Sequence, residues 1–238
     1  MIILKLLLIA HVIGDFFLQP VRLIEKKKNS MKAMIAHAVV YTLVIWFALL
    51  LFANLKELLL WSLVTFVVHL LIDILRGKLA KKYDNNAFAF WSFIASQLLH
   101  VVLIVVISYV VKSKFNSLGS AFNKLLIIKE LGFVNIINYG LAFLLILKPA
   151  SVFINYLLNL LNKEKTSEPD KISSLIGMFE RVAMLLFGIF GSYGAIALVL
   201  VSKTIIKFKQ FDDKKATQMY LVGSFASVII ALIALLII

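Results

Sequence analysis

Cysteine is absent from the 238-residue chain, which excludes disulfides, thiolate metal ligands and a cysteine nucleophile. Charge is also scarce: 16% of the residues are charged, with 12 acidic residues against 25 basic ones. Soluble domains are about half apolar. This chain is 62% hydrophobic, with a mean hydropathy of +1.01. The composition therefore excludes a soluble domain and predicts a polytopic membrane protein.

Long apolar runs recur along the whole sequence. A membrane-spanning helix needs about 20 apolar residues, so the chain has room for roughly seven to nine spans and none for a soluble domain. We expect an all-α fold with about eight transmembrane helices in one integral domain, with a four-helix core in 1–112 and further helices in 113–238. The runs lie near 2–19, 34–53, 58–75, 88–111, 133–161, 173–189, 192–206 and 218–238.

Two of these runs depart from a simple span. The run 133–161 contains Lys148-Pro149. Proline removes a backbone hydrogen bond, so we expect a kink there, with the second half of the run along the membrane interface. The stretch 173–206 is too long for one crossing and has three glycines at its middle, which favours two short spans joined by a tight turn. The alternative is one long kinked helix with a glycine packing face.

Basic residues lie in short runs between the apolar segments. This distribution encodes membrane topology rather than phosphate binding, so we expect no nucleic-acid role despite a net charge of +13. With the N-terminus outside, most of the 25 lysines and arginines fall in cytoplasmic connections, and both termini are then external. The first run lacks a small-residue cleavage site, so we expect it to be retained rather than removed as a signal.

All four histidines lie in the first hundred residues, within or at the edge of apolar runs. Two of them begin the same pattern, His11-x-x-x-Asp15 and His69-x-x-x-Asp73, which puts an imidazole and a carboxylate on one helix face. Both patterns run in the same direction and enter basic connections, which suggests a duplicated N-terminal helical hairpin. Ionisable side chains cost several kcal/mol at membrane depth, so those that persist there are usually turned inward and functional.

The depth of each polar group follows from about 1.5 Å of helical rise per residue. Counted from the cytoplasmic boundary, five groups fall in the inner leaflet. His100 and Gln97 come out deeper, as the floor of a cavity open to the cytoplasm. Glu180, the third acid within a span, falls in the same half of the membrane. The five shallower groups are His11, Asp15, His37, His69 and Asp73.

A divalent cation is the simplest way to neutralise two carboxylates and hold several imidazoles in a low-dielectric site. Nitrogen and oxygen ligands without sulfur suit zinc first, with manganese or ferrous iron as alternatives. The expected direct ligands are His11, Asp15, His69 and Asp73. The expected catalytic residues, as bases or completing ligands, are His37, His100 and Glu180. The residues expected to orient the ligands from behind are Gln19 and Gln97.

Structural interpretations of the same residues stay open. A lone histidine in an apolar helix usually hydrogen-bonds a neighbour and binds nothing. The two aspartates could pair with arginines near the surface, Arg22 and Arg76. Adjacent residues on a helix diverge by about 100°, so Glu180 and Arg181 need different partners if they pair at all.

Four segments carry a resemblance to a known family: His11-Val-Ile-Gly-Asp-Phe-Phe-Leu-Gln19, His37, His69-Leu-Leu-Ile-Asp73 and Gln97-Leu-Leu-His100. They resemble a bacterial and phage membrane-protein family known as domain of unknown function 3307. The family pattern usually has an aspartate before that glutamine, where this chain has Ser96. The resemblance implies a shared architecture, in a bacterial plasma membrane, and brings no activity with it. Further segments resemble the extension that often follows: Ser174–Arg181, Tyr193–Ile196 and Ser202–Lys209.

Two functions compete on these residues. The first is a membrane-embedded, metal-dependent hydrolase that acts at the cytoplasmic leaflet, with membrane lipid around it and a lipid or membrane-partitioned small molecule as substrate. The second is a metal-ion or proton-coupled transporter that uses the same cluster. A structural role in an envelope complex is a third class, and a homo-oligomer stays open. A transporter needs a polar path to the outer leaflet, where the spans hold almost no charge, so we favour the enzyme.

Overall fold

The computed structural model describes residues 2–19, 26–27, 30–111, 119–120, 132–162, 171–207 and 214–238. Every regular element within these ranges is helical and none is a strand, so the all-α class predicted from the sequence is confirmed. The chain divides into two compact units, Met1–Leu141 and Ala142–Ile238. The division comes later than the boundary expected at 112. Residues just before it belong to the first unit, where Lys5 donates a hydrogen bond to Asn138.

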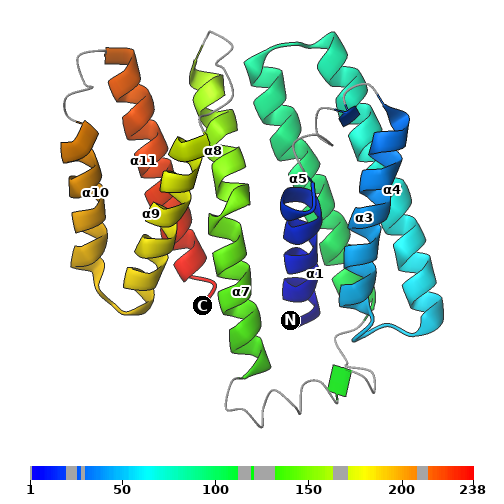
Figure 1. The fold of residues 1–238 in the computed structure, drawn as a ribbon. Coiled ribbons are helices and arrows are strands. Elements are labelled where there is room, and N and C mark those ends of the chain that lie inside the picture. Colours follow the sequence, from blue (N-terminus) through cyan, green and yellow to red (C-terminus); the bar gives the residue numbers. More distant parts are fainter. Residues whose placement is uncertain are drawn as a thin grey trace. The chain divides into compact units, whose positions relative to one another are not determined.

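The first unit is built on four helices, the first of which ends in a π-helical turn (Figure 1). Their bounds are α1 Ile2–Val12, η1 Ile13–Phe17, α3 Met31–Leu49, α4 Leu55–Lys82 and α5 Asn86–Val110. They pack as a ring, in which α1 contacts α3, α3 contacts α4, α4 contacts α5, and α5 contacts α1. Polar caps begin three of them, because Ser30, Asn54 and Asn85 each accept a backbone N–H from the first helical turn.

The ring of helices is apolar on its outer surface as well as in its interior. Phe47 is 63% exposed, and Leu63 and Trp91 are each 62% exposed. Soluble monomers rarely expose contiguous apolar surface of this extent, so these faces fit a lipid environment. The histidines of the same helices are turned to the inside, where all four are at most 3% exposed.

The second unit contains the end of α7 and four further helices. The bounds are α7 Phe133–Ile146, α8 Lys148–Leu161, α9 Lys171–Ile189, α10 Tyr193–Lys207 and α11 Lys214–Leu235. Within this unit α9 contacts α8, α10 and α11, and α11 also contacts α8. The turn that joins α9 to α10 therefore connects two helices that pack against each other.

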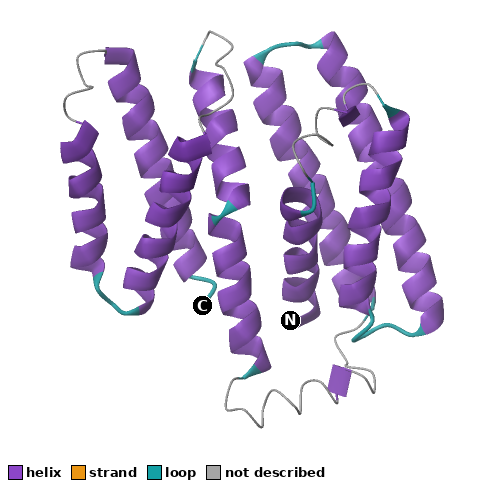
Figure 2. Cartoon of the chain, viewed as in Figure 1, coloured by secondary structure: helices purple, strands orange, loops and turns teal. Residues whose placement is uncertain are grey.

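The expected irregularities in this unit take definite forms. A break at Leu147 separates α7 from α8, visible as a short loop between two helices in Figure 2, and Pro149 lies in the first turn of α8. Residues 134–161 nevertheless form one apolar stretch long enough to span a membrane, and α8 packs on α9 and α11. The structure therefore favours a kinked span over the interfacial segment expected here. The turn between α9 and α10 contains Gly191 at a φ of 69°.

Two short helices joined by a turn replace the alternative of one long helix over 173–206, so the prediction of a turn is confirmed. Among the described residues, six helices are long and apolar enough to cross a membrane. They confirm a membrane protein, but not the number of eight. The first helix with its π turn ends at Phe17, and the apolar part of α10 covers only Tyr193–Ile205, so both are shorter than those six.

Candidate metal centre

A π-helical turn directs the central carboxylate of the first unit. The backbone N–H of Leu18 bonds to the carbonyl of Ile13 at 2.9 Å, five residues back, so the turn is wider than an α-helical one. Asp15 lies in this turn. Gly14, beside it, faces Tyr41 of α3 so closely that a Cβ there would lie 2.8 Å from Tyr41 Cδ2. Glycine therefore allows α3 to approach the turn at the depth of Asp15.

All four histidines converge on the carboxylate of Asp15. His37 Nε2 lies 3.3 Å and His69 Nε2 3.7 Å from Oδ1. His100 Nδ1 lies 3.4 Å and His11 Nδ1 3.7 Å from Oδ2. The four imidazoles come from α1, α3, α4 and α5, one from each helix of the ring. The convergence that the sequence predicts is therefore present in the structure.

The cluster separates into two groups that share one residue. His11, Asp15 and His100 form one group of potential ligand atoms, and Asp15, His37 and His69 form the other. Within each group the ligand atoms lie within 4.8 Å of one another. Each group thus offers two imidazoles and one carboxylate oxygen, and Asp15 serves both groups through its two oxygens.

Ring stacking and two hydrogen bonds hold the imidazoles in place. The ring of Tyr41 stacks on His69 with centroids 3.9 Å apart, and His69 stacks on His100 at 4.5 Å. Tyr41 also places its hydroxyl 3.1 Å from His11 Nδ1. Gln97 lies between Asp15 and the same imidazole: its Nε2 is 3.4 Å from Asp15 Oδ2 and its Oε1 3.1 Å from His11 Nε2.

Several polar atoms in the cluster have no hydrogen-bond partner within the described part of the chain. They are Asp15 Oδ1, His37 Nδ1, and both ring nitrogens of His69 and of His100. Leaving a buried polar group unsatisfied costs about 1–3 kcal/mol, so a concentration of such atoms in one place calls for an explanation. A cation bound by these atoms would satisfy the carboxylate oxygen and one nitrogen of each ring it contacts. The donor set therefore fits a metal ion.

The second carboxylate of the paired motifs has a different environment. Asp73 forms an ion pair with Lys27, and its Oδ2 lies 3.7 Å from His69 Nε2. It belongs to neither ligand group. Gln19 lies at the same edge: with its amide turned to suit both neighbours, it donates to the Asp15 carbonyl at 3.0 Å and accepts from Lys27 at 3.1 Å.

The remaining predicted residues fall in other places. Arg22 lies outside the described residues, and Arg76 places its guanidinium 5.8 Å from the ring centroid of Phe93. Glu180 belongs to the second unit, where it accepts from Lys203 at 2.6 Å. Arg181 has other partners in that unit, so the prediction that these neighbours need different partners is confirmed.

His100 and Gln97 do not form a separate floor below the other groups. They lie level with Asp15. The distance along α4 from its end at Lys82 back to His69 is almost the same as the distance along α5 from its start at Asn86 to His100. Tyr41 is the residue that sequence reasoning missed. It lies four residues after His37, so the same spacing that singled out the two His and Asp pairs also marks it.

One of three comparisons with known proteins matches the chain, over its N-terminal part. No curated protein matches the chain significantly, and no solved structure does either. A family described as "Protein of unknown function (DUF3307)" matches residues 3–128, more than half of the chain and including every residue of the cluster. The resemblance noted for the C-terminal segments lies beyond this match. The chain therefore belongs to the DUF3307 family.

Proposed function

We propose that the cluster binds one divalent metal ion, zinc in the first place, and that the protein is a membrane-embedded metal-dependent hydrolase. Its substrate would be a lipid or another membrane-partitioned molecule, reached at the cytoplasmic leaflet. The observation that carries the proposal is the convergence of four buried imidazoles on both oxygens of Asp15. Manganese or ferrous iron would accept the same ligands.

The spacing of these atoms supports a metal over a hydrogen-bonded cage. Hydrogen bonds between nitrogen and oxygen prefer about 2.7–3.2 Å. The four imidazole nitrogens lie 3.3 to 3.7 Å from the Asp15 oxygens, beyond that range. Two ligand atoms that each lie about 2.1 Å from a tetrahedral zinc are about 3.4 Å apart. The separations therefore match ligands arranged around an ion better than groups bonded to one another.

Electrostatics favours one ion per chain. A divalent ion beside Asp15 leaves a net charge of +1 in the cluster, whereas two ions would leave +3 in a low-dielectric interior, since Lys27 already neutralises Asp73. Each ligand group supplies three protein ligands. Catalytic zinc sites use three protein ligands and leave one position open.

The residues divide the chemical work between the two groups. A metal held by one of the two ligand groups would polarise a substrate oxygen and lower the pKa of a coordinated water. The two imidazoles of the other group lie beside the opposite oxygen of Asp15 and would accept a proton and return it to the leaving group. Tyr41 and Gln97 keep His11 and the stacked rings in the orientation that this requires.

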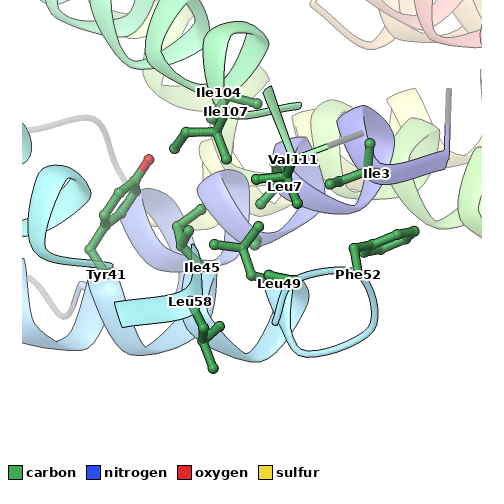
Figure 3. Packing of buried hydrophobic residues seen from close by; sticks show 12 residues of the cluster. Ile3, Leu7, Tyr41, Ile45, Leu49, Phe52, Leu58, Ile104, Ile107 and Val111 are labelled. Atoms are coloured by element: carbon green, nitrogen blue, oxygen red, sulfur yellow. The ribbon is translucent and has the colours of Figure 1, made fainter. Parts of the chain in front are cut away.

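The apolar core of the first unit favours an enzyme over a transporter. On the side of Tyr41 away from the short connection between α4 and α5, the interior is filled by aliphatic and aromatic side chains (Figure 3). Ile45, Leu49, Ile104 and Ile107 are each at most 1% exposed. An ion that crossed the unit would lose its ligands on entering this core, at a cost of many kcal/mol. An apolar core on this side of the cluster suits chemistry on a bound substrate better than the passage of an ion.

Two observations support access from the cytoplasmic leaflet. The cluster lies toward the helix ends that carry most of the basic residues, among them Lys27 and Arg76–Lys82, which the positive-inside rule assigns to the cytoplasm. The outer faces of the helices are apolar along their length, so the surroundings of the unit are lipid. A substrate that partitions into lipid is therefore the class we assign to the site.

Metal analysis of the purified protein tests the proposal. Full-length protein in nanodiscs, loaded with zinc and desalted, is measured by inductively coupled plasma mass spectrometry beside His11→Ala and His69→Ala. We expect about one zinc per chain, a loss in at least one of the two variants, and no loss in the control Asp84→Asn, which removes an acid outside both ligand groups. Zinc content unchanged in both histidine variants would contradict the site.

The hydrolase itself needs a separate assay. Nanodiscs that contain a bacterial lipid extract are incubated with the zinc-loaded protein, and products are identified by mass spectrometry. We expect hydrolysed lipid with the wild type and none with a variant that has lost its metal. Zinc transport across proteoliposomes without any hydrolysis would reverse the choice between the two functions.

A further inference from the structure

The second unit buries an arginine that forms no hydrogen bond to a carboxylate of the described residues. Arg181 of α9 is 2% exposed. Its Nε donates to the carbonyl of Ile146, and its Nη2 donates to the carbonyl of Leu147 at 3.2 Å and to Ser151 Oγ at 2.6 Å. Both carbonyls lie at the break between α7 and α8; that of Ile146 belongs to the last turn of α7, and that of Leu147 also accepts the backbone N–H of Ser151 in α8. Part of the guanidinium therefore stabilises the kink.

The rest of the guanidinium is underused. Of the five N–H groups of an arginine, the two on Nη1 have one hydrogen bond within the described residues, a long one of 3.4 Å to Ser227 Oγ. Glu180, the acid next to Arg181 in the sequence, accepts a hydrogen bond from Lys203 Nζ at 2.6 Å. Arg181, Lys203 and Glu180 together thus carry a net charge of +1. A buried charge of this kind is costly unless a counter-charge is supplied.

A cavity of about 260 Å³ opens at this arginine. Arg181 and Lys203 line it, with Ser173 and Ser174 in the first turn of α9 and Ser224 on α11. The hydroxyl of Ser224 is buried and finds no hydrogen-bond partner among the residues that the structure describes. The first turn of a helix also carries partial positive charge, which favours an anion. The cavity therefore combines two cationic groups, hydroxyl donors and a helix N-terminus.

The rest of the cavity is apolar and points to a lipid as the source of the anion. Ile154, Leu158 and Ile176 line the same cavity, and Ile176 is 51% exposed on the lipid-facing surface. Drug-sized ligands occupy about 300–1,000 Å³, so this volume suits a headgroup rather than a whole ligand. An acyl chain attached to that headgroup can continue along the exposed apolar surface.

We infer that this cavity binds the phosphate group of an anionic phospholipid. Serine hydroxyls, an arginine and a lysine are the groups that commonly bind phosphate, and one negative charge balances the net +1 of Arg181, Lys203 and Glu180. The connection between α8 and α9 contains Lys163 and Lys165, and the positive-inside rule, which counts lysines and arginines, places this end of the unit at the cytoplasmic leaflet. The site is independent of the metal centre, because all of its residues belong to the second unit.

A charge series at the cavity tests the inference without removing Arg181, whose loss could unfold the kink. Native mass spectrometry of the full-length protein in detergent measures retention of added phosphatidylglycerol. Lys203→Gln removes one positive charge and should weaken binding about fivefold, the effect of about 1 kcal/mol per basic residue near an anionic lipid. Glu180→Gln removes the negative charge and should strengthen binding by a similar factor.

Three comparisons complete the experiment. Lys56→Gln removes a lysine that is exposed on α4 and should leave binding unchanged. Diacylglycerol, which lacks the phosphate, should not be retained, and inorganic phosphate alone should compete weakly. Equal retention of phosphatidylglycerol by all variants, or of diacylglycerol by the wild type, would overturn the inference. Tight binding of inorganic phosphate with no lipid retained would assign the site to free phosphate and refute the lipid assignment.

Discussion

Substitution of Gly14 tests the metal centre without replacing any of the proposed metal ligands. A Cβ at this position would lie 2.8 Å from Tyr41 Cδ2 and 3.5 Å from Tyr41 Cα. Ordinary carbon contacts begin at about 3.5 Å, so Gly14→Ala forces the ring of Tyr41 away from the π turn by about 0.6 Å or more. Tyr41 stacks on His69 and contacts His11, so both imidazoles lose their support. The ligands would shift relative to Asp15.

The size of the effect follows from these contacts. Metal sites tolerate deviations of about 0.2 Å in ligand distance, and the loss of a group that orients ligands typically costs about 10–100-fold in metal affinity. We expect a loss in this range for Gly14→Ala. Overpacking of a well-filled interior costs about 1–3 kcal/mol, offset by about 1 kcal/mol from replacing a glycine within a helix. The protein should therefore stay folded.

Isothermal titration of zinc into apo-protein measures the affinity, and a thermal melt of the same samples measures folding. Gly140→Ala is the matched control, because a Cβ there meets only Ile9 Cδ1, at an ordinary 3.9 Å. It should leave zinc affinity unchanged and keep or slightly raise the melting temperature. A folded Gly14→Ala protein with wild-type zinc affinity would refute the role of Tyr41 in orienting the ligands.

Three further predictions follow from the same geometry. Asp15→Asn should lower zinc affinity by more than about 100-fold, because the loss of a residue that only orients a ligand already lowers metal affinity by about 10–100-fold. Asp73→Asn should change the affinity far less, because Asp73 lies outside both ligand groups. Dialysis against radioactive zinc compares the two variants. Zinc should be released as the pH falls, because protons compete with the metal for the ligand imidazoles, and equilibrium dialysis at a series of pH values measures that release. Because the chain lacks cysteine, single introduced cysteines can report its topology. A membrane-impermeant maleimide applied to intact cells should label Lys56→Cys and leave Asp84→Cys unlabelled. The reverse labelling pattern would contradict the proposed orientation.

The convergence of the histidines follows from the sequence because helical spacing fixes which side chains share a face. His11 and Asp15 share one face, and so do His69 and Asp73, and apolar surroundings force such groups inward. The equal roles that this symmetry predicts do not appear in the structure. Asp15 lies at the centre of four imidazoles, while Asp73 is held by Lys27, a partner from a connection that carries no periodic pattern.

Local geometry accounts for most of what the sequence does not reveal. The π turn at Asp15 depends on a hydrogen bond from the Leu18 N–H to the Ile13 carbonyl, five residues earlier, which the spacing of residue types does not predict. Gly14 indicates only that another segment, here Tyr41, approaches closely. The level of His100 was misjudged because counting from the edge of an apolar run ignores how far helices extend beyond it. The start of α5 at Asn86 and the end of α4 at Lys82 correct that count.

The central claim is that the imidazoles around Asp15 bind a metal directly. Zinc K-edge X-ray absorption on the zinc-loaded protein in nanodiscs measures the ligand shell without a crystal. We predict four nitrogen or oxygen neighbours at about 2.0–2.1 Å, with the outer-shell scattering of two imidazoles. A zinc shell of oxygen atoms without imidazole scattering, or a protein that retains no zinc at all, would contradict the account.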